Sequence, residues 1–149
     1  MTTKLAIADT NALMRLLVPA QDGHEEHKEA LARMHHMIVS PFVLAELDYL
    51  ITARGSAKQA ITANRFIERL RNLNRIKIPD VAPHFAAATT VAEAYTDVRG
   101  GKGIGLTDAM NVVLAKVYRT DAMFTSDKNY RIIQPLTGHD AFRLLPEDL

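Results

Sequence analysis

Short apolar runs bounded by turn residues recur along the chain and predict the strands of a sheet. The first run, Leu5-Ala6-Ile7-Ala8, contains no polar position, which is typical of a strand that is buried on both faces. Similar runs with flanking turn residues follow it. The predicted strands are residues 4–8, 37–40, 75–78, 122–125 and 142–145.

Apolar residues spaced three and four apart fill the intervening segments and predict helices over residues 11–17, 24–34, 41–53, 57–73, 83–98 and 107–118. Ser40, followed by Pro41, and Ser56 are typical N-caps, and we expect Thr107 to cap a helix that begins at Asp108. Strands that alternate with helices predict the α/β class. We expect a three-layer α/β/α sandwich around a central, mainly parallel sheet.

Length and composition narrow the possible classes of protein. The 149 residues contain no internal repeat or long linker, so we expect a single domain over residues 1–149. The absence of cysteine excludes disulfides, thiolate metal ligands and cysteine nucleophiles. No apolar run approaches the roughly 20 residues of a membrane-spanning helix. We therefore expect a soluble, cytoplasmic protein without a membrane partner.

Basic residues concentrate in one predicted helix, although the formal net charge is only +1. Residues 54–77 contain Glu68 as their one acid, against Arg54, Lys58, Arg65, Arg69, Arg71, Arg75 and Lys77. The spacing places Lys58, Arg65 and Arg69 on one face of the helix. We expect the opposite, apolar face to consist of Ile61, Phe66, Ile67, Leu70 and Leu73. The basic face is a candidate RNA-binding surface, and a solvated helix face remains the alternative.

Four acids stand within or directly after apolar segments: Asp9, Glu46, Asp108 and Asp127. A carboxylate at the end of a buried strand is costly to desolvate, so such a residue usually meets a cation or a substrate. In open α/β sheets the ligand crevice lies beyond the carboxyl ends of the strands, where Asp9 and Asp127 fall. Asp108 opens a helix, and Glu46 lies one to two turns into the helix after Pro41. We therefore expect all four to converge.

Convergent carboxylates repel one another, and a divalent cation removes that conflict. Ligands that are all oxygen suit Mg²⁺, with Mn²⁺ as a second possibility. Such an ion activates water and clamps a phosphate, so the constellation predicts phosphodiester hydrolysis.

Four segments carry a resemblance to a known family: Asp9-Thr10-Asn11, residues 40–47 around Glu46, Leu106-Thr107-Asp108-Ala109, and residues 125–130 around Asp127. In this order and spacing they resemble the four acidic motifs of the PIN-domain family, and of the VapC-type toxin ribonucleases of bacterial type II toxin–antitoxin systems in particular. The likeness covers nearly the whole chain.

The resemblance implies a Mg²⁺- or Mn²⁺-dependent endoribonuclease in which Asp9, Glu46, Asp108 and Asp127 are both the catalytic residues and the metal ligands. It also implies a homodimer and a cognate antitoxin protein that covers the acidic cleft. Thr10, Asn11, Asn111 and Ser126 would be polar supports for the carboxylates. Asn111 stands where some members carry a further acid, so the choice between one ion and two stays open.

A glycine-rich segment, residues 99–105, precedes Asp108. It is either a mobile loop that approaches the substrate, with Arg99 and Lys102 as RNA contacts, or a flexible connector. Tyr49 and Tyr130 would either stack on bases or pack against the protein. His24 and His27 do not form a zinc-protease motif, because their spacing is three residues rather than four.

Other functions remain as alternatives. A noncatalytic PIN module that binds RNA or an antitoxin would use the basic face without a metal, and a housekeeping PIN nuclease would process ribosomal RNA. A phosphatase of the haloacid-dehalogenase type would need a second aspartate at the position of Asn11.

Overall fold

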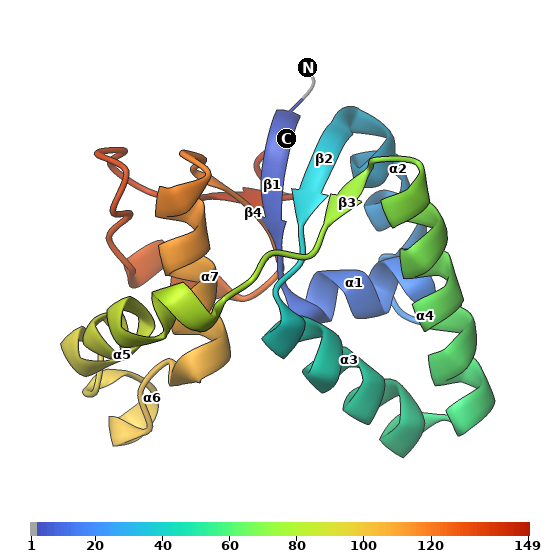
Figure 1. Ribbon diagram of the computed structural model, residues 1–149, viewed down its shortest axis with the longest axis horizontal. Helices are drawn as coiled ribbons and strands as arrows, with labels where there is room; N and C mark the ends of the chain where they lie inside the picture. Colours follow the sequence, from blue (N-terminus) through green and yellow to red (C-terminus); the bar gives the residue numbers. More distant parts are fainter. Residues whose placement is uncertain (1–2) are drawn as a thin grey trace.

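The computed structural model describes residues 3–149 and has a five-stranded sheet at its centre (Figure 1). The strands are β1 (Thr3–Ala8), β2 (Met34–Ile38), β3 (Ile76–Lys77), β4 (Ala122–Phe124) and β5 (Arg143–Leu145). Their order in the sheet is β3-β2-β1-β4-β5, and every neighbouring pair is parallel. All carboxyl ends therefore lie at one edge of the sheet, on either side of the central strand β1.

The helices form two layers, one on each face of the sheet (Figure 1). The first layer consists of α1 (Thr10–Leu17), α2 (His24–Arg33), α3 (Pro41–Arg54) and α4 (Ala57–Asn72). The second consists of α5 (Phe85–Ala94), α6 (Val98–Gly101) and α7 (Gly105–Val117), together with the 3₁₀ turns η1 (Ala82–His84) and η2 (Lys128–Ile132). The predicted α/β/α sandwich is confirmed, and the sheet is entirely parallel. No helix within residues 3–149 is both long and apolar enough to cross a membrane.

Alternate side chains of the strands enter two separate cores, which explains the uninterrupted apolar runs. Ala6 and Ala8 pack with α1 to α4, whereas Ile7 packs with α5 and α7. On β4, Phe124 belongs to the first core and Met123 to the second. A strand with a core on each face has no solvated side, so its sequence shows no polar alternation.

Several predicted boundaries are corrected by the structure. The predicted strand at residues 37–40 lies at Met34–Ile38. The predicted helix at 83–98 consists of the end of η1, then α5, and the start of α6, with a turn at residues 95–97 between the two helices. The Ser40 and Ser56 N-caps are confirmed, because their hydroxyls accept bonds from Phe42 N (3.1 Å) and Gln59 N (3.2 Å). Thr107 does not cap a helix, since α7 begins at Gly105 and Thr107 already lies in its first turn.

The apolar face expected for α4 is also partly wrong. The buried residues are Ala60, Ala63, Ile67 and Leu70, whose spacings of three and four follow one side of a helix. Ile61 is 57% exposed because it lies one position off this face, and Leu73 is 65% exposed because the helix ends before it. Small alanines on the buried face allow α4 to pack without these two large side chains.

Candidate functional site

Three aspartates meet at the carboxyl edge of the sheet. Asp9 follows β1 and is the N-cap of α1, where its Oδ1 accepts a hydrogen bond from Thr10 N (2.9 Å). Asp127 follows β4 and is the N-cap of η2, where its Oδ1 accepts a bond from Asn129 N (2.9 Å). Because β1 and β4 are adjacent and parallel, these two residues leave the sheet side by side. Asp108 approaches them from the first turn of α7.

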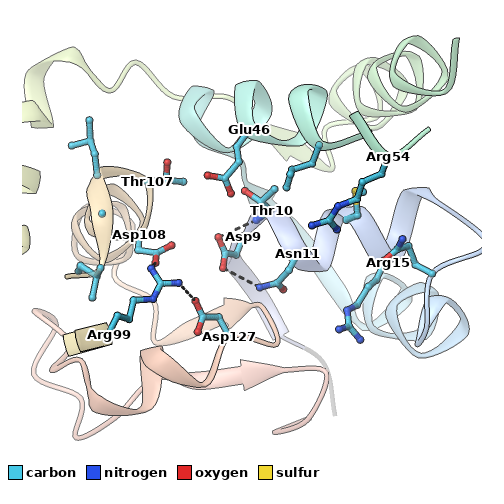
Figure 2. A pocket seen from close by; sticks show the side chains of 16 residues that line it. Asp9, Thr10, Asn11, Arg15, Glu46, Arg54, Arg99, Thr107, Asp108 and Asp127 are labelled. Carbon is cyan, nitrogen blue, oxygen red and sulfur yellow. Dashed lines mark hydrogen bonds and ion pairs between the residues drawn. The ribbon is translucent and has the colours of Figure 1, made fainter. Parts of the chain in front are cut away.

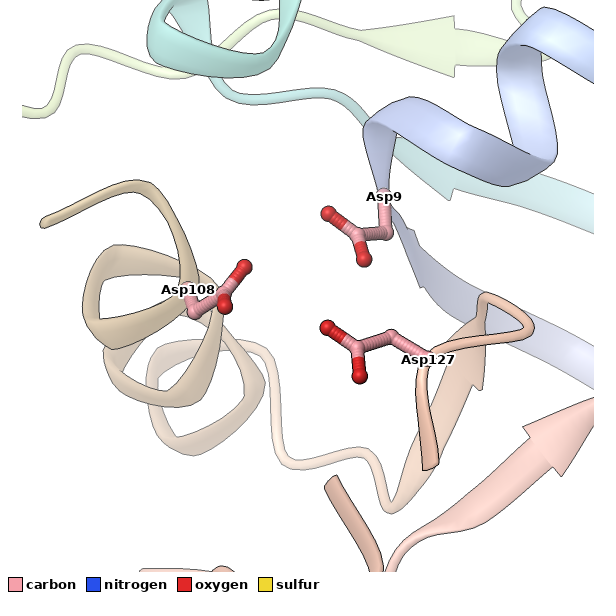
Figure 3. A group of neighbouring side chains, drawn as sticks. All are labelled: Asp9, Asp108 and Asp127. Atoms are coloured by element: carbon pink, nitrogen blue, oxygen red, sulfur yellow. The ribbon is translucent and has the colours of Figure 1, made fainter. Parts of the chain in front are cut away.

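The three carboxyl groups are close enough to share a cation. One oxygen from each of Asp9, Asp108 and Asp127 lies within 4.8 Å of the others (Figure 3). Asp9 is only 4% exposed, and the side chains of Asp108 and Asp127 are 15% and 18% exposed. The group is therefore largely shielded from water but open on one side.

Burial and mutual repulsion make this cluster costly in the absence of a cation. Burial is the main reason that the pKa of Asp9 is raised to about 6, with the charges of Asp127 and Glu46 adding to it. Burial also raises the pKa of Asp108 to about 7, and the charges of Asp9 and Asp127 add to this shift. A group of oxygens held in an unfavourable negative field is the donor set that Mg²⁺ and Mn²⁺ prefer.

Neutral polar side chains hold Asp9 in place. The Thr125 hydroxyl donates to Asp9 Oδ2 (2.8 Å), and the Asn111 amide donates to Asp9 Oδ1 (3.3 Å). The Asn11 amide donates to Thr125 Oγ1 (3.2 Å), while Asn11 Oδ1 accepts bonds from the backbone and hydroxyl of Ser126 (2.9 and 3.2 Å). Asn11, Asn111 and Ser126 thus lie where the sequence analysis expects supporting groups.

Two supporting residues were missed from the sequence. The sequence indicates Thr125 only as a member of the segment around Asp127. In the structure its hydroxyl donates to Asp9 and accepts a bond from the backbone N–H of Asp127 (3.0 Å), so it links the two acids. Tyr130 was expected to stack or pack, and it is in fact 1% exposed. Its hydroxyl donates to Asp108 Oδ1 (3.1 Å) and accepts from Asn111 (3.2 Å). Because Asn111 is fully buried among these groups, it does not line the open side of the site.

A cavity of about 560 Å³ opens beside the aspartates (Figure 2). Glu46 lines it from α3, and Figure 2 shows its carboxylate directed into the same space as Asp9 and Asp108. Glu46 is not in the group of oxygens within 4.8 Å, so the structure brings three of the four predicted acids together and places the fourth outside that group, on the wall of the same cavity. Thr10 also lines the cavity, and its buried hydroxyl has no partner within the described part of the chain.

The predicted RNA contacts fall in different places. Arg54, at the end of α3, lines the cavity, as do Arg15 and Arg99. Lys58, Arg65 and Arg69 lie farther along, on exposed positions of α4, and Lys102 is exposed in the glycine-rich segment.

Some residues of the basic stretch have structural partners of their own. The guanidinium of Arg75 donates to the carbonyls of Leu31 (2.7 Å), Met34 (2.9 Å) and His35 (3.2 Å), so this charge ties β3 to β2 and α2. Arg65 pairs with Glu68 (3.0 Å). Tyr49, by contrast, is 70% exposed on α3. The stretch is therefore not a uniform cationic surface.

Comparison with known proteins places this geometry in a family. The PIN domain model matches residues 6–134. Ribonuclease VapC26 of Mycobacterium tuberculosis is 31% identical over 146 residues, which cover 94% of this chain and 99% of that protein.

Three solved structures share the fold at identities below 25%. Mycobacterium tuberculosis VapC20, described as a sarcin–ricin loop cleaving toxin, has a TM-score of 0.66 at 16% identity and covers 83% of this chain and 90% of its own. VapBC2 of Rickettsia felis, bound to a promoter DNA fragment, has a TM-score of 0.60 at 18% identity, with coverages of 94% and 98%. A toxin–antitoxin complex from Klebsiella pneumoniae has a TM-score of 0.57 at 20% identity, with coverages of 83% and 87%. Together with the match to the family model, these findings show that the chain belongs to the PIN domain family and is related within it to the VapC proteins.

Proposed function

We propose that this protein is a VapC-type endoribonuclease that hydrolyses RNA phosphodiester bonds with a Mg²⁺ or Mn²⁺ ion. The observation that carries the proposal is the meeting of Asp9, Asp108 and Asp127, from three separate elements, with oxygens within 4.8 Å at the wall of an open cavity. A protein gains nothing in stability from such a cluster, because burial and repulsion raise the pKa of Asp9 and of Asp108. Binding of a cation is the physical reason to keep it.

The donor set fits a hard divalent cation. Asp9, Asp108 and Asp127 would hold the ion, and Glu46 would complete the ligand set from α3, which lines the same cavity. When bound, such an ion supplies neutralisation of the scissile phosphate and activation of a water molecule. Thr125 and Asn111 fix the orientation of Asp9 through hydrogen bonds, and Asn11 donates to the Thr125 hydroxyl. All three groups are neutral, so they do not reduce the negative charge that attracts the cation.

The cavity also carries positive groups suited to a polyanion. Arg15 and Arg54 line it beyond the carboxylates. Guanidinium groups bind phosphate oxygens in a planar, bidentate manner. We place Arg54 beside the reacting phosphate and propose that the exposed residues Lys58, Arg65, Arg69 and Lys102 contact more distant parts of the RNA.

The test is incubation of the purified protein with total cellular RNA in EDTA, Mg²⁺ or Mn²⁺, followed by mapping of new 5′ ends. We expect discrete cuts that require the ion and that are lost in Asp9→Asn, while the thermal unfolding of this variant shows an intact fold. RNA binding without cleavage in any ion would instead support the noncatalytic module. Cuts confined to ribosomal precursors would support a processing enzyme.

We further propose that the protein acts in the cytoplasm as a homodimeric toxin neutralised by a cognate antitoxin, and that residues 1–149 form one domain. Two of the structural neighbours are described as a VapBC assembly and a toxin–antitoxin complex, which supports the choice of partner. The test is expression of the protein alone and together with a small protein encoded directly upstream of its gene; absence of any such reading frame would count against the toxin. Growth arrest that the second protein relieves, and co-purification of the two, are the expected results.

A further inference from the structure

Arg99 is the one cationic residue that contacts two members of the aspartate cluster in the described part of the chain. Its Nη1 lies 3.8 Å from Asp108 Oδ2, and its Nη2 lies 3.8 Å from Asp127 Oδ2 (Figure 2). The guanidinium therefore lies against two of the three groups that we assign to the metal ion. In the absence of a metal, it supplies the positive charge nearest to the cluster.

The two contacts are loose. Both distances exceed the roughly 2.7–3.2 Å of a hydrogen bond, and the Arg99 side chain is 44% exposed. An exposed ion pair of this kind changes an equilibrium by up to about fivefold. Electrostatic attraction thus keeps Arg99 at the cluster without locking it there.

The backbone around Arg99 is unusual and unconfined. Arg99 has a left-handed conformation (φ 55°, ψ 40°), which is unfavourable for a residue with a Cβ, and Gly100 after it has φ 65°. A Cβ placed on Gly100, Gly101 or Gly105 would meet no atom within 4 Å. A strained arginine on an open, glycine-rich segment beside a cavity points to a functional use of its side chain.

We propose that Arg99 is a displaceable counter-ion, which neutralises Asp108 and Asp127 in the metal-free protein and moves to the substrate phosphate when the divalent ion binds. This inference rests on the proposed function of the site. The guanidinium contacts two of the three carboxyl groups that would hold the ion, so we expect their binding to be competitive. After displacement, Arg99 still faces the cavity that it lines together with Arg54, and a guanidinium binds phosphate oxygens well.

The competitive step is tested by calorimetric titration of the metal-free protein with Mn²⁺. We expect Arg99→Ala to bind Mn²⁺ about fivefold more tightly than the wild type, because the variant has no guanidinium to displace. Arg54→Ala is the matched control, since it removes the same charge from the same cavity but has no ion pair with an acid in the described chain. Equal tightening in both variants would show a general field effect and overturn the competition.

The transfer to phosphate is tested by fluorescence anisotropy with a mixed-sequence single-stranded RNA, whose integrity is checked on a gel. With saturating Ca²⁺ as the divalent ion in the site, we expect Arg99→Ala to bind the RNA about fivefold more weakly than the wild type. In EDTA we expect no difference, because Arg99 is then held by the aspartates. A loss of equal size in both conditions, or in neither, would overturn the transfer.

These outcomes separate the inference from the function on which it rests. A wild-type protein that neither binds Mn²⁺ nor cuts RNA refutes the proposed nuclease, and the role of Arg99 with it. A wild type that does both, with an Arg99→Ala variant of unchanged Mn²⁺ affinity, refutes only the role of Arg99.

Discussion

Replacement of Asp108 by asparagine is expected to stabilise the metal-free protein while it destroys the metal site. The side chain is 15% exposed, and its pKa is raised from the usual 3.8 to about 7, mainly by burial and then by the charges of Asp9 and Asp127. A raised pKa means that the folded state binds the proton more tightly than the unfolded state. The contribution of Asp108 to stability is therefore best at low pH and worsens as the pH rises from about 4 to about 7.

The size of the effect follows from the difference between the two pKa values. At 1.36 kcal/mol per unit, ionisation of Asp108 costs the folded, metal-free state at most about 4 kcal/mol above pH 7. Asparagine keeps an oxygen that can accept the Tyr130 hydrogen bond, but it loses the attraction of Arg99 and still buries an amide. We therefore expect a net gain of about 2 kcal/mol in the free energy of unfolding.

The measurement is urea unfolding at pH 8 in EDTA, with the exposed Asp140→Asn as the control for loss of one acidic charge. Asp108→Asn should raise the urea midpoint in EDTA, whereas the control should leave it nearly unchanged. Addition of Mn²⁺ should then stabilise the wild type and the control but not Asp108→Asn, because only a competent site gains stability from ligand. An Asp108→Asn protein less stable than the wild type in EDTA would refute the electrostatic account of the cluster.

Three further variants test other parts of the structure. Tyr130→Phe should keep the edge-on packing against Phe142 (6.1 Å between ring centroids) but lose the hydroxyl that donates a hydrogen bond to Asp108. Carbon NMR titration should therefore show a higher pKa for Asp108 in this variant. An unchanged pKa would show that the Tyr130 hydroxyl does not stabilise the charged form of Asp108. His27 is buried against Phe124, its Nδ1 donates to the Gly23 carbonyl (2.7 Å), and its Nε2 has no partner within residues 3–149. Because burial lowers the pKa of His27, the wild type should lose stability as the pH falls below about 6.5. His27→Gln should therefore show a shallower fall in melting temperature between pH 7.5 and 5. Arg75→Ala should lower the free energy of unfolding by about 2 kcal/mol, because three carbonyl groups lose their hydrogen-bond donor. RNA affinity should change little. A marked loss of RNA binding with unchanged stability would instead show that Arg75 contacts RNA.

Features of the site that depend on strand order and direction could be predicted from the sequence. Asp9 and Asp127 each follow a buried parallel strand, and adjacent parallel strands end at the same edge, so their meeting follows from strand placement alone. The position of Glu46 depends on how α3 leaves the sheet, which no local pattern encodes, and this acid lines the cavity outside the group of three aspartates. The start of α7 at Gly105 was missed because Thr107 offered a more typical cap than the glycine-rich segment before it.

The hydrogen-bond and ion-pair partners of individual side chains could not be predicted from the sequence. The sequence indicates only that Tyr130 is an aromatic residue that stacks or packs. Its hydroxyl contacts Asp108 and Asn111, which belong to a different element, so these bonds depend on the fold. The sequence groups Arg75 with the other basic residues of this stretch, because its three carbonyl partners lie 40, 41 and 44 positions away in the chain. Arg99 is a similar case, since its left-handed backbone conformation sets where the guanidinium points.

The aspartate cluster contacts two kinds of side chain, namely buried neutral groups and one exposed, charged group in the described part of the chain. Thr125, Asn111 and Tyr130 are buried, and they orient the aspartates through hydrogen bonds without adding positive charge. A buried lysine or arginine in their place would neutralise the cluster permanently and leave little attraction for a metal ion. The cation that does contact the aspartates, Arg99, is instead 44% exposed on the glycine-rich segment. Under the proposed function, this arrangement keeps the negative field of the three aspartates available to a divalent ion, at the cost of stability in the metal-free protein.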